Sequence, residues 1–364
     1  MSASHGFLQP LPPPVELETV AVMRSLAAAN RALAELKGRA ATIPNQGILI
    51  DTLALQEAKA SSEIENIVTT QDELFQMDLF PDGLESGAAK EVARYRDALK
   101  LGLTQLLDTG GLIRNATLID MYRFLKARSD GFRSTPGTAL KNDRTGEVVY
   151  RPPQDRNEII AAMSSLEAFI NDDELCRLDP LIKMALIHHQ FESIHPFADG
   201  NGRIGRILNV LYLTRTGLLD IPILYLSRHI NQHKAEYYRL LQSVREEGEW
   251  EPWVLYMLEA VEKTSRTTLA LVEGIRKQMA DVKQRMRTHL PKLYSQDLLN
   301  NLFRHPYTRI QFVRDDLRVT RQTAAEYLEQ LVEKGFLEKH KSGRSNYYIN
   351  TALVALFLQV SEGP

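Results

Sequence analysis

The sequence contains a single cysteine in 364 residues, Cys176, and this scarcity excludes two classes of structure. One cysteine cannot form a disulfide within the chain, and it cannot build a metal centre from several thiolates. Low cysteine content is typical of proteins that work in a reducing compartment. We therefore expect a cytoplasmic protein.

Long apolar runs and a strong net charge are also missing. No stretch of about 18 apolar residues occurs, and the N-terminus lacks the basic and apolar segments of a signal peptide. We expect neither a membrane span nor secretion. The formal net charge of −2 argues against a chain built as a whole to coat nucleic acid, although it leaves local basic patches open.

Alternating β-branched runs are scarce, whereas helix formers are abundant, so we predict a mostly α fold. With 44% hydrophobic residues, the chain is long enough for two or three domains. We divide it into an extended proline-rich lead (1–14), an N-terminal helical region (15–103), a helical core (104–250), linking helices (251–290) and a C-terminal domain (291–364).

Turn signals interrupt the helical pattern at two places. A loop from Pro81 to Gly87 divides the N-terminal region, after which helical periodicity resumes. Further turns, including Asn142-Asp143, lead into three residues with strand character, which are Val148, Val149 and Tyr150. We predict a β-hairpin flap in this segment.

Capping signals predict two consecutive helices in the middle of the chain. Asp179-Pro180 is an N-cap followed by a first-turn proline, and it predicts a helix that ends near Ser193. A second helix should run over about 202–216 and stop at Gly217. One or two long helices should then fill 251–289.

The C-terminal domain has the element order of a winged helix-turn-helix. Helices are predicted over 297–303, 310–315 and 320–334, followed by strands at 337–339 and 347–349. The third helix would be the recognition helix, and basic residues at the wing could contact phosphate. These wing residues are Lys339, His340, Lys341 and Arg344, and nearby acidic residues dilute their field.

One stretch concentrates residue types that bind polyphosphates. Residues 195–206 read His-Pro-Phe-Ala-Asp-Gly-Asn-Gly-Arg-Ile-Gly-Arg. Glycines let the backbone approach a ligand, and a turn leading into a helix presents unpaired N–H groups to an anion. Arg203 and Arg206 share one helix face and can grip phosphate oxygens. Asp199 suits Mg²⁺ beside phosphates, and His195 suits removal of a proton from a hydroxyl group.

The same stretch resembles the Fic family motif, His-x-Phe-x-(Asp/Glu)-Gly-Asn-Gly-Arg-x-x-Arg, at every fixed position. The resemblance implies a helical Fic core that transfers AMP from ATP to Ser, Thr or Tyr hydroxyls of target proteins and of the chain itself, releasing pyrophosphate. It implies that His195 is the general base and that Asp199 binds Mg²⁺. The ATP-binding residues implied in this stretch are Gly200, Asn201, Gly202, Arg203, Ile204, Gly205 and Arg206.

A second motif lies upstream of the core. The segment Ser61-Ser-Glu-Ile-Glu65-Asn66 resembles the Fic inhibitory signature, (Ser/Thr)-x-x-x-Glu-(Gly/Asn). Ser61 and Glu65 are four residues apart and share a helix face. The resemblance implies that Glu65 pairs with Arg206 and withdraws it from the γ-phosphate. Some relatives also use this glutamate to help hydrolyse AMP from targets, so a bifunctional enzyme remains an alternative.

Two further segments resemble parts of Fic proteins. The flap at 148–150 resembles a hairpin that aligns a target segment by strand addition, and the alternative is a plain surface hairpin. Asn231, Tyr237 and Tyr238 fall in a stretch that contributes to the adenine pocket in relatives. The alternative for the two tyrosines is packing in the protein core.

Two classes of function stay open at this stage. One is an adenylyltransferase restrained by Glu65, with ATP and hydroxyl-bearing proteins as partners. The other is a transcriptional regulator that senses ATP with its core and binds DNA through its tail. The complete set of loop residues favours the enzyme, because a sensor needs no base beside the α-phosphate. Family habit adds a homodimer as an expectation.

Overall fold

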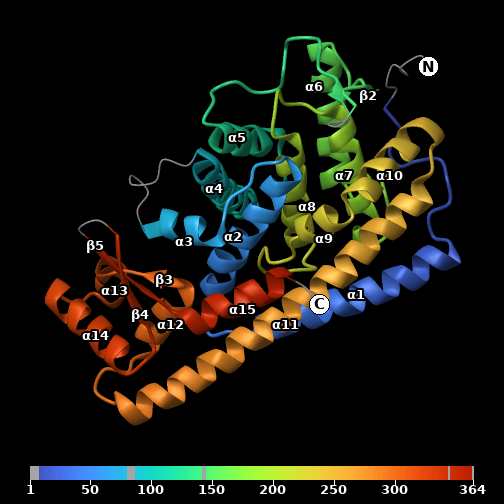
Figure 1. Cartoon of the computed structure of the whole chain (residues 1–364). Helices are drawn as coiled ribbons and strands as arrows, with labels where there is room; N and C mark the ends of the chain where they lie inside the picture. The colour runs from blue at the N-terminus through green and yellow to red at the C-terminus, as the bar shows by residue number, and fades with distance from the viewer. Residues whose placement is uncertain (1–7, 80–86, 142–144, 343–344, 363–364) are drawn as a thin grey trace.

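The structure, a computed structural model, describes residues 8–79, 87–141, 145–342 and 345–362. It is mostly helical with two small antiparallel sheets, which confirms the predicted fold class (Figure 1). Within these ranges, no helix is long and apolar enough to cross a membrane. The predicted loop at 81–86, the turn at Asn142-Asp143 and the wing residue Arg344 lie outside the described residues.

The described part of the N-terminal region contains four helices. These are α1 (Val20–Ala40), α2 (Gly47–Ile64), α3 (Gln71–Leu79) and α4 (Gly87–Asp108). Helix α1 starts later than the apolar periodicity indicates, because the hydroxyl of Thr19 caps the N–H of Val22 and sets the first turn there. Helix α4 continues to Asp108, past the boundary predicted after residue 103.

The core follows with six helices and the flap. Its elements are α5 (Asn115–Lys126), β1 (Leu140–Lys141), β2 (Val148–Tyr150), α6 (Arg156–Asn171), α7 (Pro180–Ile194), α8 (Asn201–Arg215), α9 (Ser227–Gln232) and α10 (Lys234–Glu247). Strands β1 and β2 pair as the predicted hairpin. Helices α7 and α8 match their predicted ends within one or two residues, and the Asp179 side chain caps α7 by accepting from the Leu181 N–H.

Helix α7 is buried along its whole length and forms the centre of the core. Helix α8 packs directly against it, so the short loop between the two helices is held on a rigid base. Hydrophobic residues surround both helices, and the polar and charged residues of the two helices are largely buried with them. A site in this loop is therefore positioned by two buried helices that pack against each other.

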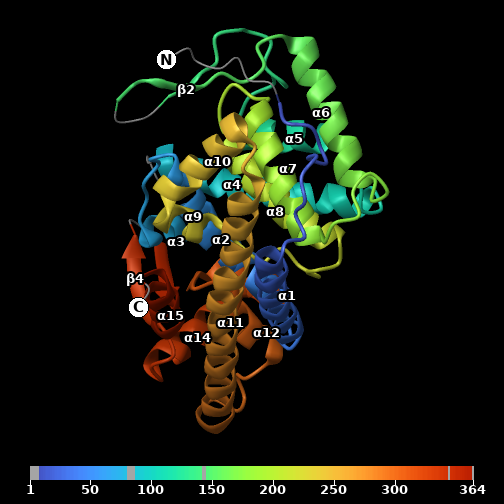
Figure 2. The ribbon, with the colours of Figure 1, turned by 90° about the vertical axis from the view of Figure 1, so that its right-hand side faces the viewer.

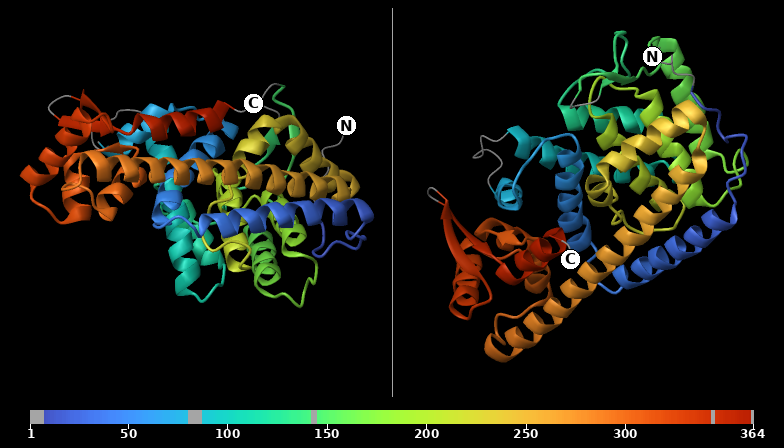
Figure 3. Two further views of the ribbon diagram at one scale, coloured as in Figure 1. Left: turned by 90° about the horizontal axis from the view of Figure 1, so that it is seen from below. Right: turned by 45° about the vertical axis from the view of Figure 1, so that its right-hand side comes forward.

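A single helix, α11 (Trp250–His289), fills the linking segment, which is one of the two possibilities that the sequence left open. It is 40 residues long and lies beside α1 in every view (Figures 2 and 3). The indole N–H of Trp253 donates to the Ala185 carbonyl and fixes α11 to the central helix α7. The flap lies near one end of α11, and the C-terminal domain lies at the other (Figure 2).

The C-terminal domain contains every predicted helix and strand in the expected order, with two additions. Its elements are α12 (Gln296–Arg304), β3 (Tyr307–Thr308), α13 (Ile310–Leu317), α14 (Arg321–Glu333), β4 (Glu338–Ser342), β5 (Ser345–Ile349) and α15 (Thr351–Glu362). The short strand β3, which pairs with β5, and the helix α15, which packs on α11, were not predicted. The guanidinium of Arg304 contacts the Asp51 carboxylate at 2.6 Å, so this domain rests on α2.

Candidate active site

The loop between α7 and α8 has the conformation that its residue types require. His195 ends α7 with a φ of 50°, and Gly200 precedes α8 with a φ of 74°. The Asn201 side chain accepts from the Phe197 N–H at 2.8 Å and donates to the Phe197 carbonyl at 2.9 Å. Both ends of this amide are therefore used to close the loop. Asn201 shapes the loop here through these two bonds, and its predicted part in ATP binding stays a prediction.

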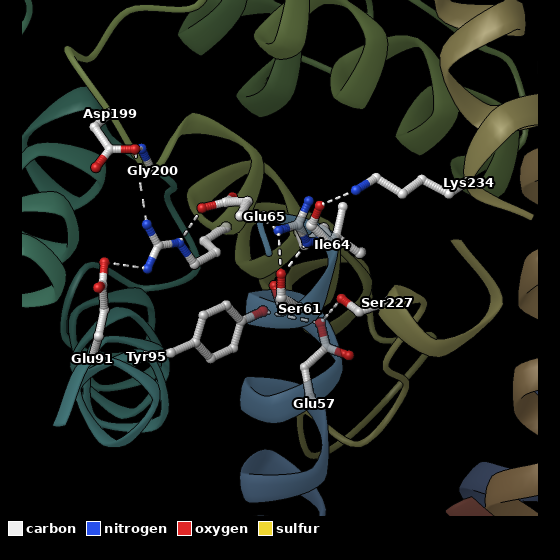
Figure 4. Close-up of polar contacts among 12 residues, drawn as sticks. Glu57, Ser61, Ile64, Glu65, Glu91, Tyr95, Asp199, Gly200, Ser227 and Lys234 are labelled. Atoms are coloured by element: carbon white, nitrogen blue, oxygen red, sulfur yellow. Dashed lines mark hydrogen bonds and ion pairs between the residues drawn. The ribbon is translucent and has the colours of Figure 1, made fainter. Parts of the chain in front are cut away.

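The two arginines of the motif meet the inhibitory segment at the start of α8 (Figure 4). Arg206 donates to the Ser61 hydroxyl at 2.7 Å and to the Ser61 carbonyl at 2.9 Å, and it contacts Glu65 at 3.1 Å. The other oxygen of Glu65 lies 2.6 Å from Nε of Arg203. The predicted pair between Glu65 and Arg206 is present, and Glu65 bridges both arginines.

Gly202 makes this bridge sterically feasible. A Cβ atom at position 202 would lie 2.8 Å from Nη1 of Arg206 and 3.0 Å from Oε1 of Glu65. Both distances are shorter than ordinary contacts to carbon. Any larger residue would push the guanidinium or the carboxylate away, so glycine at this position serves close approach rather than backbone freedom.

The end of α2 holds Glu65 in place. Asn66 adopts a φ of 62°, and the Ile67 N–H donates back to the Ser62 carbonyl at 3.0 Å, which is the hydrogen-bond pattern of a Schellman C-cap. The Lys234 ammonium, at the start of α10, donates to the Ile64 carbonyl at 2.6 Å. The left-handed backbone explains why the inhibitory signature needs Gly or Asn after the glutamate.

Buried carboxyl groups surround Arg206 without contacting it directly. Glu57 accepts from Tyr95 at 3.0 Å and from the Ser227 hydroxyl, and burial raises its pKa to about 7 (Figure 4). Burial likewise raises the pKa of Glu192 to about 7, although Arg206 and Arg245 act against it. Within the described residues, Glu65 is the carboxylate that contacts the Arg206 guanidinium directly, at 3.1 Å.

His195 lies between two arginines that the motif does not contain. Nε of Arg133 donates to the His195 carbonyl at 2.8 Å, and Nε of Arg245 donates to the Ser193 hydroxyl, two residues earlier, at 3.0 Å. Burial lowers the pKa of His195 to about 3, and the positive charges of Arg245 and Arg133 contribute. The imidazole is thus neutral near pH 7 and can accept a proton. Its Nδ1 is buried without a hydrogen-bond partner in the described part of the chain.

The low pKa of His195 leads to a testable expectation. Without nucleotide, the imidazole should remain neutral down to about pH 4, since its pKa is lowered to about 3. A bound nucleotide brings negative charge next to the ring, so the pKa should rise by roughly one unit or more. NMR titration of histidine-labelled protein, with His195→Asn to assign the signal, measures both values. An ordinary pKa near 6.5 in the free protein would contradict the electrostatic environment described here.

Asp199 is suited to a metal ion bound mainly by phosphate. Burial alone would raise its pKa, but Lys126 and Arg203 outweigh that effect, so its pKa lies below the ordinary value and the group is ionised. Its side chain is 58% exposed. No cluster of three or more metal-ligating side chains occurs in the described ranges. A single carboxylate matches Mg²⁺, which completes its coordination with phosphate oxygens and water.

Two motif residues assigned to ATP face the protein interior instead. Ile204 is fully buried in the hydrophobic core. Gly205 faces α7, where a Cβ atom would lie 2.7 Å from Oε1 of Glu192. These two residues therefore allow α8 to pack closely against α7. Both positions face the protein interior and not the surface where a nucleotide would bind. The small residue at position 205 is a packing requirement.

The residues assigned to the adenine pocket separate into different environments. Tyr237 is buried, and its hydroxyl hydrogen-bonds to Nε2 of His188 at 2.8 Å, so it belongs to the core. Asn231 donates to Glu63 at 3.4 Å, and Glu63 points away from the Ser61 face of α2 because the two are two residues apart. Tyr238 is 48% exposed and remains accessible to a ligand. The packing alternative is therefore correct for Tyr237.

The three flap residues assigned to target docking also differ in their exposure. Tyr150 is buried, and its hydroxyl donates to the Ser193 carbonyl at 3.1 Å while its ring lies 4.1 Å from the Arg245 guanidinium. It anchors β2 to the end of α7. Val149 is 41% exposed, and Val148 is partly exposed. Of the three predicted docking residues, only these two valines can meet a target.

Sequence reasoning missed four charged residues that shape the site. They are Glu91, Lys126, Arg133 and Arg245. The Glu91 carboxylate accepts from Nη1 of Arg203 at 2.6 Å, and Lys126 contacts both Glu91 and Asp199. None lies in a recognisable motif. In a single sequence, a charged residue on a helix or loop resembles a solvated one, so no local signal could have identified them.

Three family descriptions match consecutive parts of the chain. The Fic/DOC family N-terminal region matches residues 23–104, the Fic/DOC family matches 112–213, and the C-terminal domain of protein adenylyltransferase SoFic-like proteins matches 278–353. Together they span the inhibitory segment, the loop and the C-terminal domain. The segment predicted as a winged helix, 291–364, therefore overlaps the match to the C-terminal domain of SoFic-like adenylyltransferases.

Individual relatives give the same result. The chain is 32% identical over 183 residues to protein adenylyltransferase Fic of Culex quinquefasciatus and 31% identical over 183 residues to that of Aedes aegypti. Each match covers 50% of this chain and 34% of the relative, so the chain spans about a third of the length of these curated relatives.

Solved structures agree in fold. A Fic family protein from Desulfovibrio desulfuricans superposes with a TM-score of 0.56 at 19% identity, covering 93% of this chain and 98% of that one. Fic-1 of Caenorhabditis elegans superposes with a TM-score of 0.54 at 20% identity, covering 69% of this chain and 74% of that one. With the loop geometry, the motif and these matches in agreement, this chain belongs to the Fic/DOC family.

Proposed function

We propose that the chain transfers AMP from ATP to hydroxyl side chains of target proteins and of itself. The hydroxyl oxygen attacks the α-phosphorus, the bond from that phosphorus to the pyrophosphate oxygen breaks, and pyrophosphate leaves. The hydroxyl proton passes to the imidazole of His195. Because no covalent enzyme intermediate is needed, most of the acceleration comes from positioning and charge stabilisation.

Each loop residue has a physical task in this reaction. Arg203 and Arg206 lie on one face of α8 and can bind the β- and γ-phosphates once Glu65 releases them. The N–H groups at the start of α8 face the anion, with Gly200 allowing the approach. Asp199 would hold Mg²⁺, which neutralises charge on the phosphates and the leaving group. His195 is neutral and accepts the proton.

The observation that carries the proposal is the joint arrangement of a neutral histidine, an ionised aspartate and two arginines around one helix N-terminus. A purely structural loop requires neither a buried neutral histidine nor two arginines that pair with a carboxylate from a separate helix. Several relatives carry the name protein adenylyltransferase, which supports the same reaction.

The reaction is tested by intact-protein mass spectrometry of Glu65→Gly after incubation with ATP and Mg²⁺. A mass gain equal to one AMP group for each modified hydroxyl, with an equal amount of pyrophosphate released, is the expected result. A gain equal to one phosphate group would identify a kinase. Unchanged mass with a range of added protein substrates would remove the basis for AMP transfer.

We also propose that Glu65 restrains this activity. Its carboxylate occupies both motif arginines, and the Ser61 hydroxyl and carbonyl take two further donors of Arg206. A γ-phosphate that binds in this state finds neither guanidinium free. Release of the restraint requires only that the last turn of α2 moves, because Glu65 is its C-cap residue.

Lys234 should strengthen the restraint from a distance, because its ammonium caps the Ile64 carbonyl beside Glu65. Lys234→Ala removes one charge-assisted hydrogen bond, and we expect AMP transfer to rise about two- to fivefold, corresponding to roughly 0.5–1 kcal/mol. The matched control is Lys59→Ala, because Lys59 pairs with Glu63 on the other face of α2. Initial rates of self-modification measure the effect, and equal changes in both variants would argue against a capping role.

A further inference from the structure

Lys126 is the last residue of α5, and its side chain reaches the loop between α7 and α8. Its ammonium lies 2.6 Å from Oδ2 of Asp199 and 2.5 Å from Oε1 of Glu91. Its Cδ lies 3.4 Å from the position that a Cβ atom of Gly200 would occupy. Only 16% of the side chain is exposed. The lysine is thus packed over the loop, with its charge placed on the carboxylate that suits a metal ion.

The contact completes a chain of alternating charges across the site. In order along this chain, the groups are Asp199, Lys126, Glu91, Arg203, Glu65 and Arg206. Figure 4 shows Asp199, Glu91 and Glu65 around one guanidinium group, that of Arg203, which contacts all three. Each of the three carboxylates in this series of charges contacts a cationic side chain of the protein. A metal ion at Asp199 must therefore enter a site where a cation is already in place.

We propose that Lys126 competes with the divalent cation for the Asp199 carboxylate and so sets the metal concentration at which nucleotide binds. The inference rests on the proposed nucleotide-binding function of this loop. One oxygen of Asp199 faces Lys126, while the other accepts the Gly200 N–H at 2.6 Å. A metal ion bound to Oδ2, the oxygen that faces Lys126, would have to share this oxygen with the ammonium group. The two positive charges would repel each other.

Glu91 provides the alternative position that such competition needs. It already accepts from the Lys126 ammonium, so the lysine can release Asp199 and keep one ionic contact with a small movement. Glu91 also accepts from Nη1 of Arg203, and α4 keeps it in place whether or not Glu65 leaves. Burial alone would raise the pKa of Glu91, but Lys126 and Arg203 outweigh that effect and keep it below the ordinary value, so the carboxylate is ionised.

The test measures binding rather than catalysis. Calorimetric titration with ATP, once with Mg²⁺ and once with EDTA, gives a ratio of the two dissociation constants for each protein. All proteins carry Glu65→Gly and His195→Ala, so that ATP binds without restraint and is not consumed. We expect Lys126→Met to increase the preference for the metal-bound nucleotide about three- to tenfold, whereas Lys126→Arg should stay near the parent value.

Two further variants locate the effect. Arg123→Met removes a positive charge from the same helix, where the guanidinium pairs with Asp120, and should leave the ratio unchanged. Asp199→Asn should remove the metal preference, and Lys126→Met should then have no additional effect on the ratio. Lys126→Gln serves as a second neutral variant if Lys126→Met folds poorly.

Each outcome bears on one hypothesis. An unchanged ratio in both neutral variants would overturn the competition. Equal weakening of ATP binding with and without Mg²⁺ would also overturn it, because Lys126 would then be a phosphate ligand. Failure of the parent protein to bind ATP in either condition would instead contradict the proposed function itself, and this inference with it.

Discussion

Glu65→Gly will raise the rate of self-modification by about tenfold or more, because each 1.4 kcal/mol of lost competition for the arginines corresponds to a factor of ten. In the structure the Glu65 carboxylate contacts Arg203 at 2.6 Å and Arg206 at 3.1 Å. Removing it frees both guanidinium groups for phosphate oxygens. Labelled ATP and initial rates at saturating Mg²⁺ measure the change.

The same substitution should lower stability while it raises activity. Arg203 and Arg206 are buried, and they lose a charged partner, so the free energy of unfolding should fall by roughly 1–3 kcal/mol. Arg206 keeps its hydrogen bonds to Ser61, and Arg203 keeps Glu91, which limits the loss. General loosening of the fold would lower both the rate of self-modification and the free energy of unfolding. A higher rate together with a lower free energy of unfolding therefore indicates that Glu65 restrains the site specifically.

Glu63→Gly is the matched control for this prediction. It removes a glutamate and introduces a glycine in the same last turn of α2, but Glu63 pairs with Lys59 away from the arginines. Its activity should remain near the wild-type value, although its stability should also decrease. If Glu63→Gly activated the protein as strongly as Glu65→Gly, fraying of α2 would explain the activity, and the carboxylate contacts would not.

Removal of the His195 imidazole will reduce AMP transfer by about 100- to 10,000-fold, as expected for loss of a general base. The substitution needs care, because His195 has a φ of 50° and alanine is strained in that region. Asparagine tolerates the left-handed conformation better but is not a base. His195→Ala and His195→Asn in the Glu65→Gly background therefore separate loss of the base from distortion of the loop.

Both histidine variants should still bind ATP, because the arginines proposed to bind the phosphates, Arg203 and Arg206, lie on α8. Equilibrium binding of labelled ATP provides this second readout. A protein that binds ATP normally but transfers nothing has lost the chemical step. Substantial transfer by His195→Asn would show that another group takes the hydroxyl proton, and the assignment of His195 would be wrong.

Local signals predicted the centre of the fold well. The ends of α7 and α8 follow from Asp179-Pro180 and from the glycines around the loop, and the structure places them within one or two residues. Features that depend on distant contacts were not predicted. Strand β3 exists because it pairs with β5, and helix α15 lies where it does because it packs on α11. No pattern within either segment records those partners.

The same division applies to the site. His195, Asp199, Arg206 and Glu65 belong to short motifs whose spacing carries their chemistry, so they could be named from the sequence. Lys126, which α5 brings to Asp199, is separated from it by more than 70 positions in the chain and has no motif of its own. Tyr237 was assigned to the adenine pocket from the family resemblance, and packing in the core stayed open as the alternative, because the burial of one aromatic residue on a helix cannot be read from the sequence.

The most direct measurement of the central claim uses ATP labelled at either the α- or the γ-phosphate with Glu65→Gly protein. Transfer of AMP predicts protein-bound label from the α-position only, strong in Glu65→Gly, weak in wild type and absent in the Glu65→Gly protein that also carries His195→Asn. Label from the γ-position would mean that a phosphate group is transferred instead. No bound label from either position, in protein that binds ATP, would contradict the assignment of this loop as an AMP-transfer site.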